Sequence, residues 1–160
     1  MSSRNFDRMI QLVDEFFQMK NDPDQLSITS EVMERLKKMH PSTMTERAND
    51  DGPIAWILIF PTTGDLMKEF LESRISEGTL FEKTPLGIRY DSIYLCSALL
   101  LPEFRKSGLA GNMTVEAVEG IRKDHPITSL FYWAFSSEGD RLAEAVSRRT
   151  SLPVYKRENE

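Results

Sequence analysis

The sequence predicts an α/β fold of the α+β type, in which helices flank a mixed central sheet. Ile54–Phe60 and Ser92–Leu101 are apolar at nearly every position, as expected of strands that are buried on both faces beneath helices. From Ser92 onward the pattern alternates strand, helix, strand, helix and strand, the order expected of right-handed crossover connections. The 160 residues are predicted to form one domain, because a chain of this length fills a single core.

Two amphipathic helices are expected in the N-terminal part, residues 1–50. Asn5–Lys20 carries its apolar side chains at helical spacing. Ser30–Met39 has an acid in its first turn and two lysines in its last, and a proline follows two positions later, which is the pattern of a complete helix. Pro41–Gly52 is polar and is expected to be a loop.

The rest of the chain is expected to supply helices and short strands around the two buried segments. Apolar periodicity and capping residues predict a helix at Thr63–Ile75, an irregular stretch at Gly78–Arg89, a helix at Gly108–Lys123, a strand at Ile127–Ala134, a helix at Ser137–Arg149 and a closing strand at Leu152–Lys156. Aromatic residues of the strands, such as Trp56 and Phe131, are expected to pack against these helices or to line a pocket.

Composition excludes several classes of protein. With 25 acidic and 20 basic side chains, the chain has a net charge of −5 and no basic stripe, so nucleic acid is not an expected partner. One cysteine and two histidines offer neither an internal disulfide nor metal-ligand spacing. His40 and His125 are expected at solvated helix ends. No apolar run is long enough to cross a bilayer and no secretory signal is recognised, so we expect a cytoplasmic protein without a membrane partner.

The segment that carries chemistry is Ile93–Gly111, where a buried strand leads through a short turn into a helix. The first turn of a helix offers unpaired amides and the positive end of the dipole, which together attract an anion. Gly108, Ala110 and Gly111 are small enough for a phosphate to approach the backbone, and Ser107 can cap the helix or donate to a phosphate oxygen. Arg105 and Lys106 add local positive charge.

An alternative reading is that these small residues serve tight packing of the helix alone. The spacing is not the GxGxxG fingerprint of dinucleotide-binding folds, and it lacks the Gly-Lys-Ser/Thr order of a P-loop. The sequence therefore predicts an anion cradle of another kind.

The run Leu100–Ala110 (LLPEFRKSGLA) resembles the acetyl-CoA-binding motif of the GNAT superfamily of acyl-CoA N-acyltransferases. In that motif a strand ends in an apolar-Pro-Glu-aromatic-Arg segment, and a turn with the pattern Arg-x-x-Gly-x-Gly/Ala opens a helix. Arg105, Gly108 and Ala110 fit the second part. The resemblance covers about residues 92–156 and implies an acyl-CoA-binding core there, within a GNAT-like mixed sheet.

The same resemblance implies a co-substrate and a reaction. The co-substrate is acetyl-CoA or another acyl-CoA, no metal takes part, and the acyl group passes to a small-molecule or peptide amine. The backbone amides from Arg105 to Ala110 are implied to hold the CoA pyrophosphate, and the backbone of Leu99–Leu101 to pair with the pantetheine arm. The implied cofactor-binding residues are Leu99, Leu100, Leu101, Arg105, Lys106, Ser107, Gly108, Leu109, Ala110 and Gly111.

The chain also departs from the family pattern in three places. No strand is expected before the two N-terminal helices. Thr63–Ile75 is predicted to be helical where the family has part of an antiparallel hairpin. Residues 139–147 contain no tyrosine, whereas the last helix of the family often carries one that protonates the leaving thiolate. Cofactor binding is therefore better supported than acyl transfer.

Acyl transfer requires a base for the amine and a group that polarises the thioester carbonyl. The candidates lie where the two strands of the motif would part, and they are Tyr94, Ser136 and Glu138, with Cys96, Ser97 and Tyr132 in the same region. Cys96 is more simply explained as a small buried hydrophobe, and Glu138 as an acid favoured at a helix start.

Two other classes of function stay open. One is a GNAT-like module that binds CoA or regulates without catalysing transfer. The other is a protein-interaction domain, in which Phe6, Phe16 and Phe17 of the first helix face a partner and not the core. The sequence is compatible with a monomer or a homodimer.

Overall fold

The computed structural model describes residues 4–20, 29–133 and 136–158, with the backbone alone at residues 16–20. A five-stranded mixed sheet in the order β1-β2-β3-β4-β5 forms its centre. The strands are β1 (Met44–Asn49), β2 (Gly52–Thr62), β3 (Ser92–Leu100), β4 (Ser129–Trp133) and β5 (Val154–Arg157). Strands β1 to β3 pair antiparallel, and β3 to β5 pair parallel.

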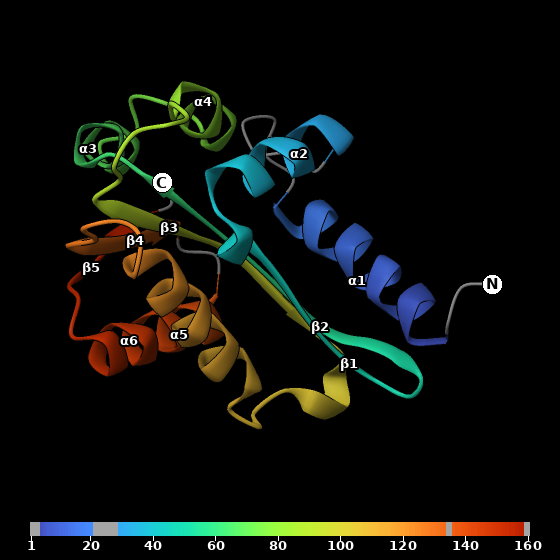
Figure 1. Ribbon diagram of the computed structural model, residues 1–160. Coiled ribbons are helices and arrows are strands. Elements are labelled where there is room, and N and C mark those ends of the chain that lie inside the picture. Colours follow the sequence, from blue (N-terminus) through green and yellow to red (C-terminus); the bar gives the residue numbers. More distant parts are fainter. Residues whose placement is uncertain (1–3, 21–28, 134–135, 159–160) are drawn as a thin grey trace.

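Helices cover both faces of the sheet. They are α1 (Arg4–Lys20), α2 (Ser30–Met39), α3 (Gly64–Leu71), α4 (Glu77–Lys83), α5 (Leu109–Arg122) and α6 (Ser137–Thr150). Helices α1 to α4 lie on one side, and α5 and α6 lie on the other (Figure 1). The predicted α/β fold with a mixed sheet flanked by helices is therefore confirmed.

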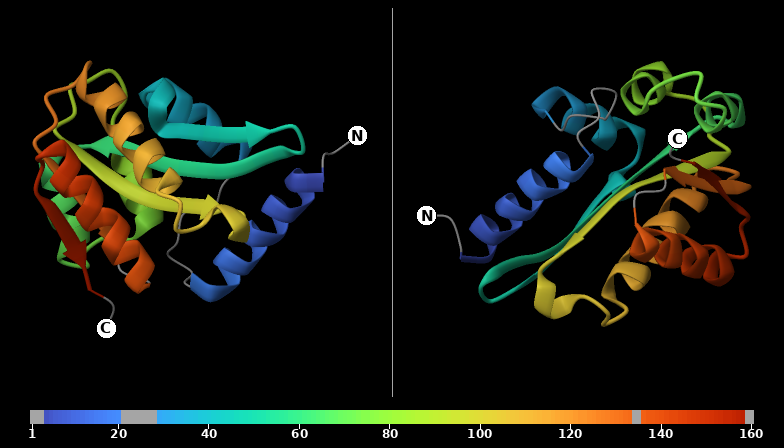
Figure 2. Two further views of the ribbon diagram at one scale, coloured as in Figure 1. Left: turned by 90° about the horizontal axis from the view of Figure 1, so that it is seen from below. Right: turned by 180° about the vertical axis from the view of Figure 1, so that it is seen from behind.

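Strands β1 and β2 form a long hairpin whose tip projects beyond the other strands on the side of α1 (Figure 2). The expectation of a loop at Pro41–Gly52 is wrong, because this segment holds the 3₁₀ turn η1 (Pro41–Thr43) and all of β1. Strand β1 lies at the edge of the sheet, and most of its side chains are exposed. Its polarity therefore reflects exposure, as edge strands commonly show, and not the absence of a strand.

The predicted irregular stretch at Gly78–Arg89 also needs correction. Helix α4 begins at Glu77, directly before this stretch, and runs into it as far as Lys83; the Ser76 hydroxyl accepts the Thr79 amide at 3.0 Å as the N-cap. Leu80 and Phe81 of this helix are buried. The helix has only seven residues, too few for its apolar side chains to show a helical period in sequence.

Helix α3 confirms the predicted helix that follows β2, although it ends at Leu71, earlier than Ile75. The remaining predicted helices and strands are also present, with ends that differ by a few residues. An aromatic cluster lies between the sheet and α3 and α4, where Phe60, Phe70, Tyr94 and Phe131 meet with ring centroids 5.1–5.8 Å apart. Aliphatic side chains fill the opposite face under α5 and α6.

Helix α1 packs on the sheet through Met9, which is fully buried. Phe6 is 40% exposed, and its ring meets Trp56 edge-on at 6.0 Å. Ile10 is also 40% exposed. The prediction for Phe16 and Phe17 lies outside the described side chains. The exposed apolar residues of α1 keep the protein-interaction alternative open.

Neither histidine occupies the solvated helix end that the sequence predicts. His40 is buried; its Nε2 lies 2.6 Å from an Asp124 carboxylate oxygen, and its Nδ1 accepts the Ser42 amide at 3.0 Å. The His125 ring packs on Tyr90, and its Nδ1 accepts the Tyr90 amide at 3.3 Å. Burial, followed by the nearby charge of His40, lowers the pKa of His125 below its ordinary value of 6.5.

We expect the free energy of unfolding to fall as the pH drops below about 6.5. The unfolded chain binds a proton at His125 more readily than the folded chain, because the folded pKa is lowered. The stability that neutral His125 contributes is therefore present above the pKa of His125 in the unfolded chain, and it is lost as the pH falls toward the pKa of His125 in the folded protein. Urea unfolding of the wild type and of His125→Asn at about pH 8 and about pH 5 measures this change in the free energy of unfolding.

The asparagine variant is expected to lose less stability on acidification than the wild type, because its side chain does not titrate. Equal losses in the two proteins would contradict the assignment to His125.

Candidate functional site

A cleft opens where β3 and β4 part. Their parallel pairing ends at Leu95 and Tyr132, yet β3 continues to Leu100. The space left beside the free part of β3 has a volume of about 480 Å³. The two strands of the motif therefore diverge here, as predicted.

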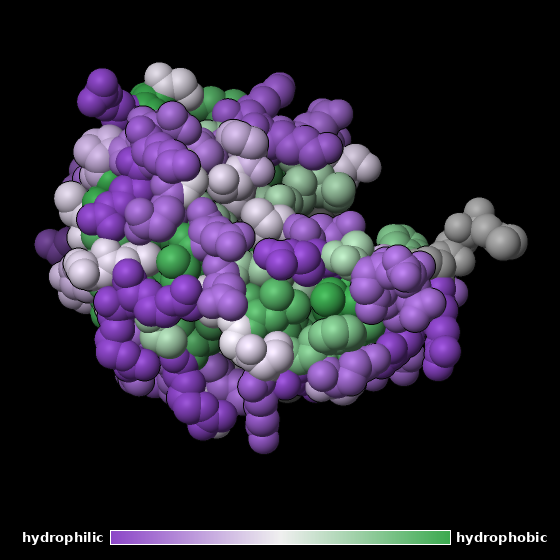
Figure 3. Space-filling view, turned by 60° about the horizontal axis from the view of Figure 1, so that its bottom comes forward, coloured by the Kyte–Doolittle hydropathy of each residue, from purple (hydrophilic) through white to green (hydrophobic). Residues whose placement is uncertain are grey.

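The walls of the cleft come from both sides of the sheet. Gly108, Leu109 and Leu142 line it from the side of α5 and α6, whereas Leu58, Cys96 and Trp133 line it from the side of the aromatic cluster. Figure 3 brings forward the end of the molecule that carries the start of α5, and it shows hydrophobic surface exposed between hydrophilic regions there. The cleft is thus a passage with mostly apolar walls.

The turn between β3 and α5 forms one end of this cleft. The 3₁₀ turn η2 (Pro102–Phe104) comes first, and Lys106 and Gly108 then adopt positive φ angles of 63° and 85°. Gly108 is the N-cap of α5, and no side-chain cap completes the helix end. A positive φ suits the glycine at position 108, and turns with left-handed residues are the kind that can form an anion-binding concavity.

Most of the predicted anion-binding amides are available. Within the described part of the chain, the amides of Lys106, Ser107, Gly108 and Ala110 donate no hydrogen bond to the protein. The Arg105 amide donates to the Pro102 carbonyl at 3.2 Å, and the Leu109 amide donates to the Ser107 hydroxyl at 3.3 Å. The predicted run of amides from Arg105 to Ala110 is therefore interrupted at Arg105 and Leu109.

The hydrogen bonds of β3 bear on the expected pairing of the Leu99–Leu101 backbone with a ligand. The Leu101 amide donates to the Ile54 carbonyl at 3.0 Å. Because hydrogen bonding alternates along an antiparallel pair, the main-chain groups of Leu99 also face β2. Those of Leu100 face the cleft, where its carbonyl accepts Arg105 Nε at 3.2 Å. The expected backbone pairing of Leu99 and Leu101 with a ligand is therefore wrong. The main-chain groups of Leu99 and the Leu101 amide face β2, and the Leu101 carbonyl accepts the Phe104 amide at 2.9 Å.

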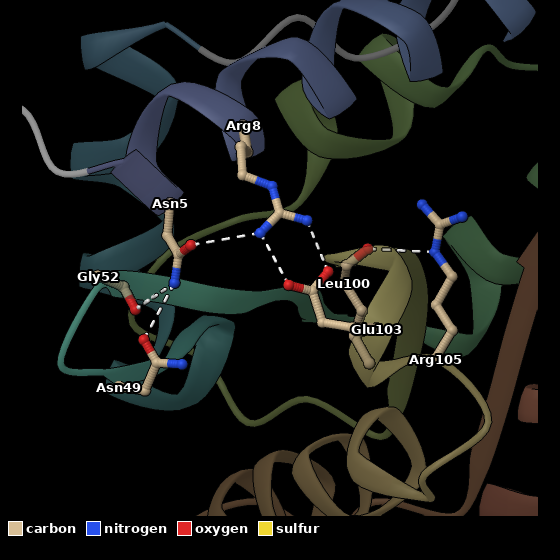
Figure 4. A network of polar contacts seen from close by, with 7 residues as sticks. All are labelled: Asn5, Arg8, Asn49, Gly52, Leu100, Glu103 and Arg105. Carbon is tan, nitrogen blue, oxygen red and sulfur yellow. Dashed lines mark hydrogen bonds and ion pairs between the residues drawn. The ribbon is translucent and has the colours of Figure 1, made fainter.

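Arg105 and Lys106 add positive charge at the same end of the cleft, because both belong to the turn. Arg141 and the acidic Glu138 also line the cleft, from α6. In Figure 4 the outer nitrogens of Arg105 point away from Glu103, while its Nε reaches Leu100. The side chains at this end therefore add to the positive end of the α5 dipole.

An ion pair attaches α1 to the turn. Arg8 donates to both carboxylate oxygens of Glu103, at 2.6 and 2.8 Å (Figure 4). The hydrogen bond from Arg8 is the main reason that the pKa of Glu103 is lowered to about 2. One turn earlier, Asn5 donates to Asn49 and Gly52 of the β1–β2 hairpin at 3.0 and 3.4 Å. Helix α1 thus joins the hairpin to the segment that precedes Arg105.

The candidate catalytic residues lie in different places. Ser136 and Glu138 line the cleft and are exposed, but the Ser136 hydroxyl is the N-cap of α6 and accepts the Gly139 amide at 3.0 Å. Tyr94 is not in the cleft. It is fully buried in the aromatic cluster, and its hydroxyl donates to Glu77 at 2.5 Å. Burial, with the charge of Glu77, raises the pKa of Tyr94 well above its ordinary value.

Two polar features near the cleft arise only from tertiary packing: a set of hydrogen bonds around Asp140, and the buried carboxylate of Glu77. The Tyr132 hydroxyl donates to Asp140 at 2.8 Å, and Lys156 donates to the same carboxylate at 3.2 Å. These two hydrogen bonds connect β4, α6 and β5 along one wall of the cleft. Burial, followed by the hydrogen bond to Asp140, raises the pKa of Tyr132. Glu77 is fully buried behind the other wall. Nothing in the sequence distinguishes Glu77 from an ordinary acid in the first turn of a helix.

Among the described residues, no three His, Cys, Asp or Glu side chains gather as a metal site. No described helix has both the length and the apolarity needed to span a membrane. Comparison of the chain with protein-family models, curated proteins and solved structures found no match. The case for a function therefore depends on the cleft and its chemistry.

We expect Arg8→Gln to raise the pKa of Glu103 from about 2 toward 4.5, because the main stabiliser of its carboxylate is removed. Carboxyl-detected NMR titration measures this shift directly. Arg74→Gln is the matched control, since Arg74 pairs with Glu72 at 3.5 Å elsewhere on the surface.

Faster hydrogen exchange of the amides after Glu103 should accompany the shift in the Arg8 variant, because α1 no longer holds the turn. An unchanged Glu103 titration would show that the ion pair does not form in solution.

Proposed function

We propose that the protein binds acetyl-CoA, or another acyl-CoA, in this cleft and transfers the acyl group to an amine, as a divergent GNAT-like acyltransferase. The observation that carries the proposal is the parting of β3 and β4 directly beside the unpaired amides at the start of α5. An extended molecule with an anionic end fits such a site.

The anionic end of the ligand would meet the turn. The amides of Lys106, Ser107 and Gly108 are consecutive and unpaired, and a diphosphate accepts hydrogen bonds from several amides at once. The chain is acidic overall, with a net charge of −5. Local amides and the few cations at the cleft therefore have to overcome a repulsive surrounding charge.

The arm of the ligand would follow the free edge of β3. The main-chain groups of Leu100 face this edge, and apolar side chains such as Leu109 and Leu142 line the space beside it. The thioester would then reach the point where β3 and β4 meet. An apolar passage at that point excludes water and strengthens the polarisation of the carbonyl.

A second candidate is CoA binding without acyl transfer. It is favoured by the position of Tyr94, which the aromatic cluster buries away from the cleft, and by the absence of tyrosine from residues 139–147. Turnover of acetyl-CoA with an amine separates the two candidates.

Gly108→Glu is expected to abolish acetyl-CoA binding in isothermal titration calorimetry. A Cβ at Gly108 meets no atom within 4 Å, so the carboxylate would project at the turn and repel a diphosphate. Gly87→Glu is the matched control, because Gly87 has a similar positive φ of 77° and equally open surroundings, and it does not line the cleft. Both variants carry the same backbone strain and the same added charge.

Wild-type and Gly87→Glu proteins that bind acetyl-CoA, with a Gly108→Glu protein that does not, would support the proposal. No detectable heat from the wild type at millimolar ligand would refute it.

A further inference from the structure

The free part of β3 begins at a β-bulge. Leu58 of β2 pairs with Ser97, but the next residue, Ile59, pairs with Leu95, so Cys96 is the extra residue. A bulge bends its strand and redirects a side chain, and bulges are common beside active sites. Here the redirected side chain is a thiol that lines the cleft where β3 and β4 part.

A buried carboxylate lies directly behind this thiol. Glu77 has no exposed surface, and its Oε2 lies 3.9 Å from Cys96 Sγ, within the distance of a weak S–H···O hydrogen bond. The same oxygen accepts the Tyr94 hydroxyl at 2.5 Å. A carboxylate in an aromatic cluster is costly to desolvate, so its position calls for a role beyond packing.

The bulge lies where the reacting end of an extended ligand would arrive. Cys96 is four residues before Leu100 on the same strand, a distance of about 13 Å along β3. A ligand that reaches about this far from an anionic end at the start of α5 would have its other end beside Cys96. Leu58 and Trp133 form the apolar wall beyond, on the side of α3 and α4.

We infer that Glu77 is the proton acceptor for the acceptor amine, that Cys96 relays the proton, and that the amine reaches the cleft from the side of the aromatic cluster. The inference rests on the proposed function. The apolar wall fits a primary amine that carries an apolar group, bound in its neutral form.

The proton transfers balance over one turnover. The amine nitrogen attacks the thioester carbon, a C–N bond forms, and the C–S bond breaks with its electron pair on sulfur. One N–H proton passes to the Cys96 sulfur while the thiol proton of Cys96 passes to Glu77. The Glu77 proton then returns through Cys96 to the CoA thiolate, which leaves as the thiol, and the carboxylate is restored.

Other ionisable groups lie near this cluster. Tyr94 and Cys96 of β3 both contact Glu77, and Arg157 of β5 acts on Tyr94 through its charge. Arg157 stacks on the rings of Phe70 and Trp133, with 4.5 Å to each centroid, and donates to the Ile75 carbonyl at 3.2 Å. The Tyr94 hydroxyl donates to the Glu77 carboxylate, so this carboxylate has a hydrogen-bond partner inside the aromatic cluster.

The first experiment measures the contact between Glu77 and Cys96 without any enzymatic activity. Cys96 is the single cysteine of the chain, so alkylation by iodoacetamide reports on this position alone. Glu77→Gln should move the pH profile of alkylation down by about one unit, because the neighbouring negative charge disfavours the thiolate. Glu82→Gln, the same change at an exposed position of α4, should leave it in place. An unshifted profile in Glu77→Gln would overturn the inference.

The second experiment measures acetyl transfer from acetyl-CoA to 2-phenylethylamine. Glu77→Gln and Cys96→Ala should each lower kcat by about 100-fold without changing the KM for acetyl-CoA. Cys96→Ser should lose less than Cys96→Ala, because a hydroxyl can still relay a proton. A structural role would predict equal losses in the two Cys96 variants and would overturn the inference.

Calorimetry with acetyl-CoA distinguishes a failure of the proposed function from a failure of the roles assigned to Glu77 and Cys96. No binding by the wild type refutes the proposed function. Binding and transfer by the wild type, with full transfer by Glu77→Gln, refutes the assignment of Glu77 alone. Binding without transfer by the wild type refutes the relay and favours the module without catalysis. Circular dichroism at each step confirms that a variant is folded.

Discussion

The short pairing between β3 and β4 is the constraint on which the rest of the site depends. Only four residue pairs join the two strands, and from Cys96 to Leu100 β3 has β2 alone as a neighbouring strand. Unpaired backbone groups in a sheet interior are costly, so a fold retains them where something else satisfies them. Arg105 satisfies the Leu100 carbonyl here. The cleft is therefore a built feature of the sheet and not a gap in its packing.

The two sides of the parting are held by separate polar connections. On one side, the Arg8–Glu103 pair holds the turn before α5 against α1. On the other, Tyr132, Asp140 and Lys156 tie β4 to α6 and β5. An exposed ion pair contributes little to overall stability, but it can fix the position of a short segment. The first connection fixes the segment before Arg105, and the second fixes Tyr132, and both Arg105 and Tyr132 line the cleft.

The sequence predicts those parts of the fold whose burial is two-sided. Ile54–Phe60 and Ser92–Leu101 are continuous apolar runs because helices cover both faces, and each is found as a strand. Strand β1 escaped prediction because one edge of it faces solvent, and α4 because it is short. The turn after Leu101 was predictable since its small and basic residues are adjacent in sequence. Glu77 was not, because only tertiary packing brings α4 against a bulge in β3.

The bulge at Cys96 lies at the point where the cleft opens and where α4 packs on β3. The extra residue at Cys96 bends β3 at the place where its pairing with β4 ends, and that bend allows the two strands to diverge. It also places a thiol between the cleft and a buried carboxylate. A single added residue thus lies both at the parting of the strands and beside the buried carboxylate. Under the function we propose, the start of α5 would receive the anionic end of an acyl-CoA, and the carboxylate behind Cys96 would accept the proton of the amine.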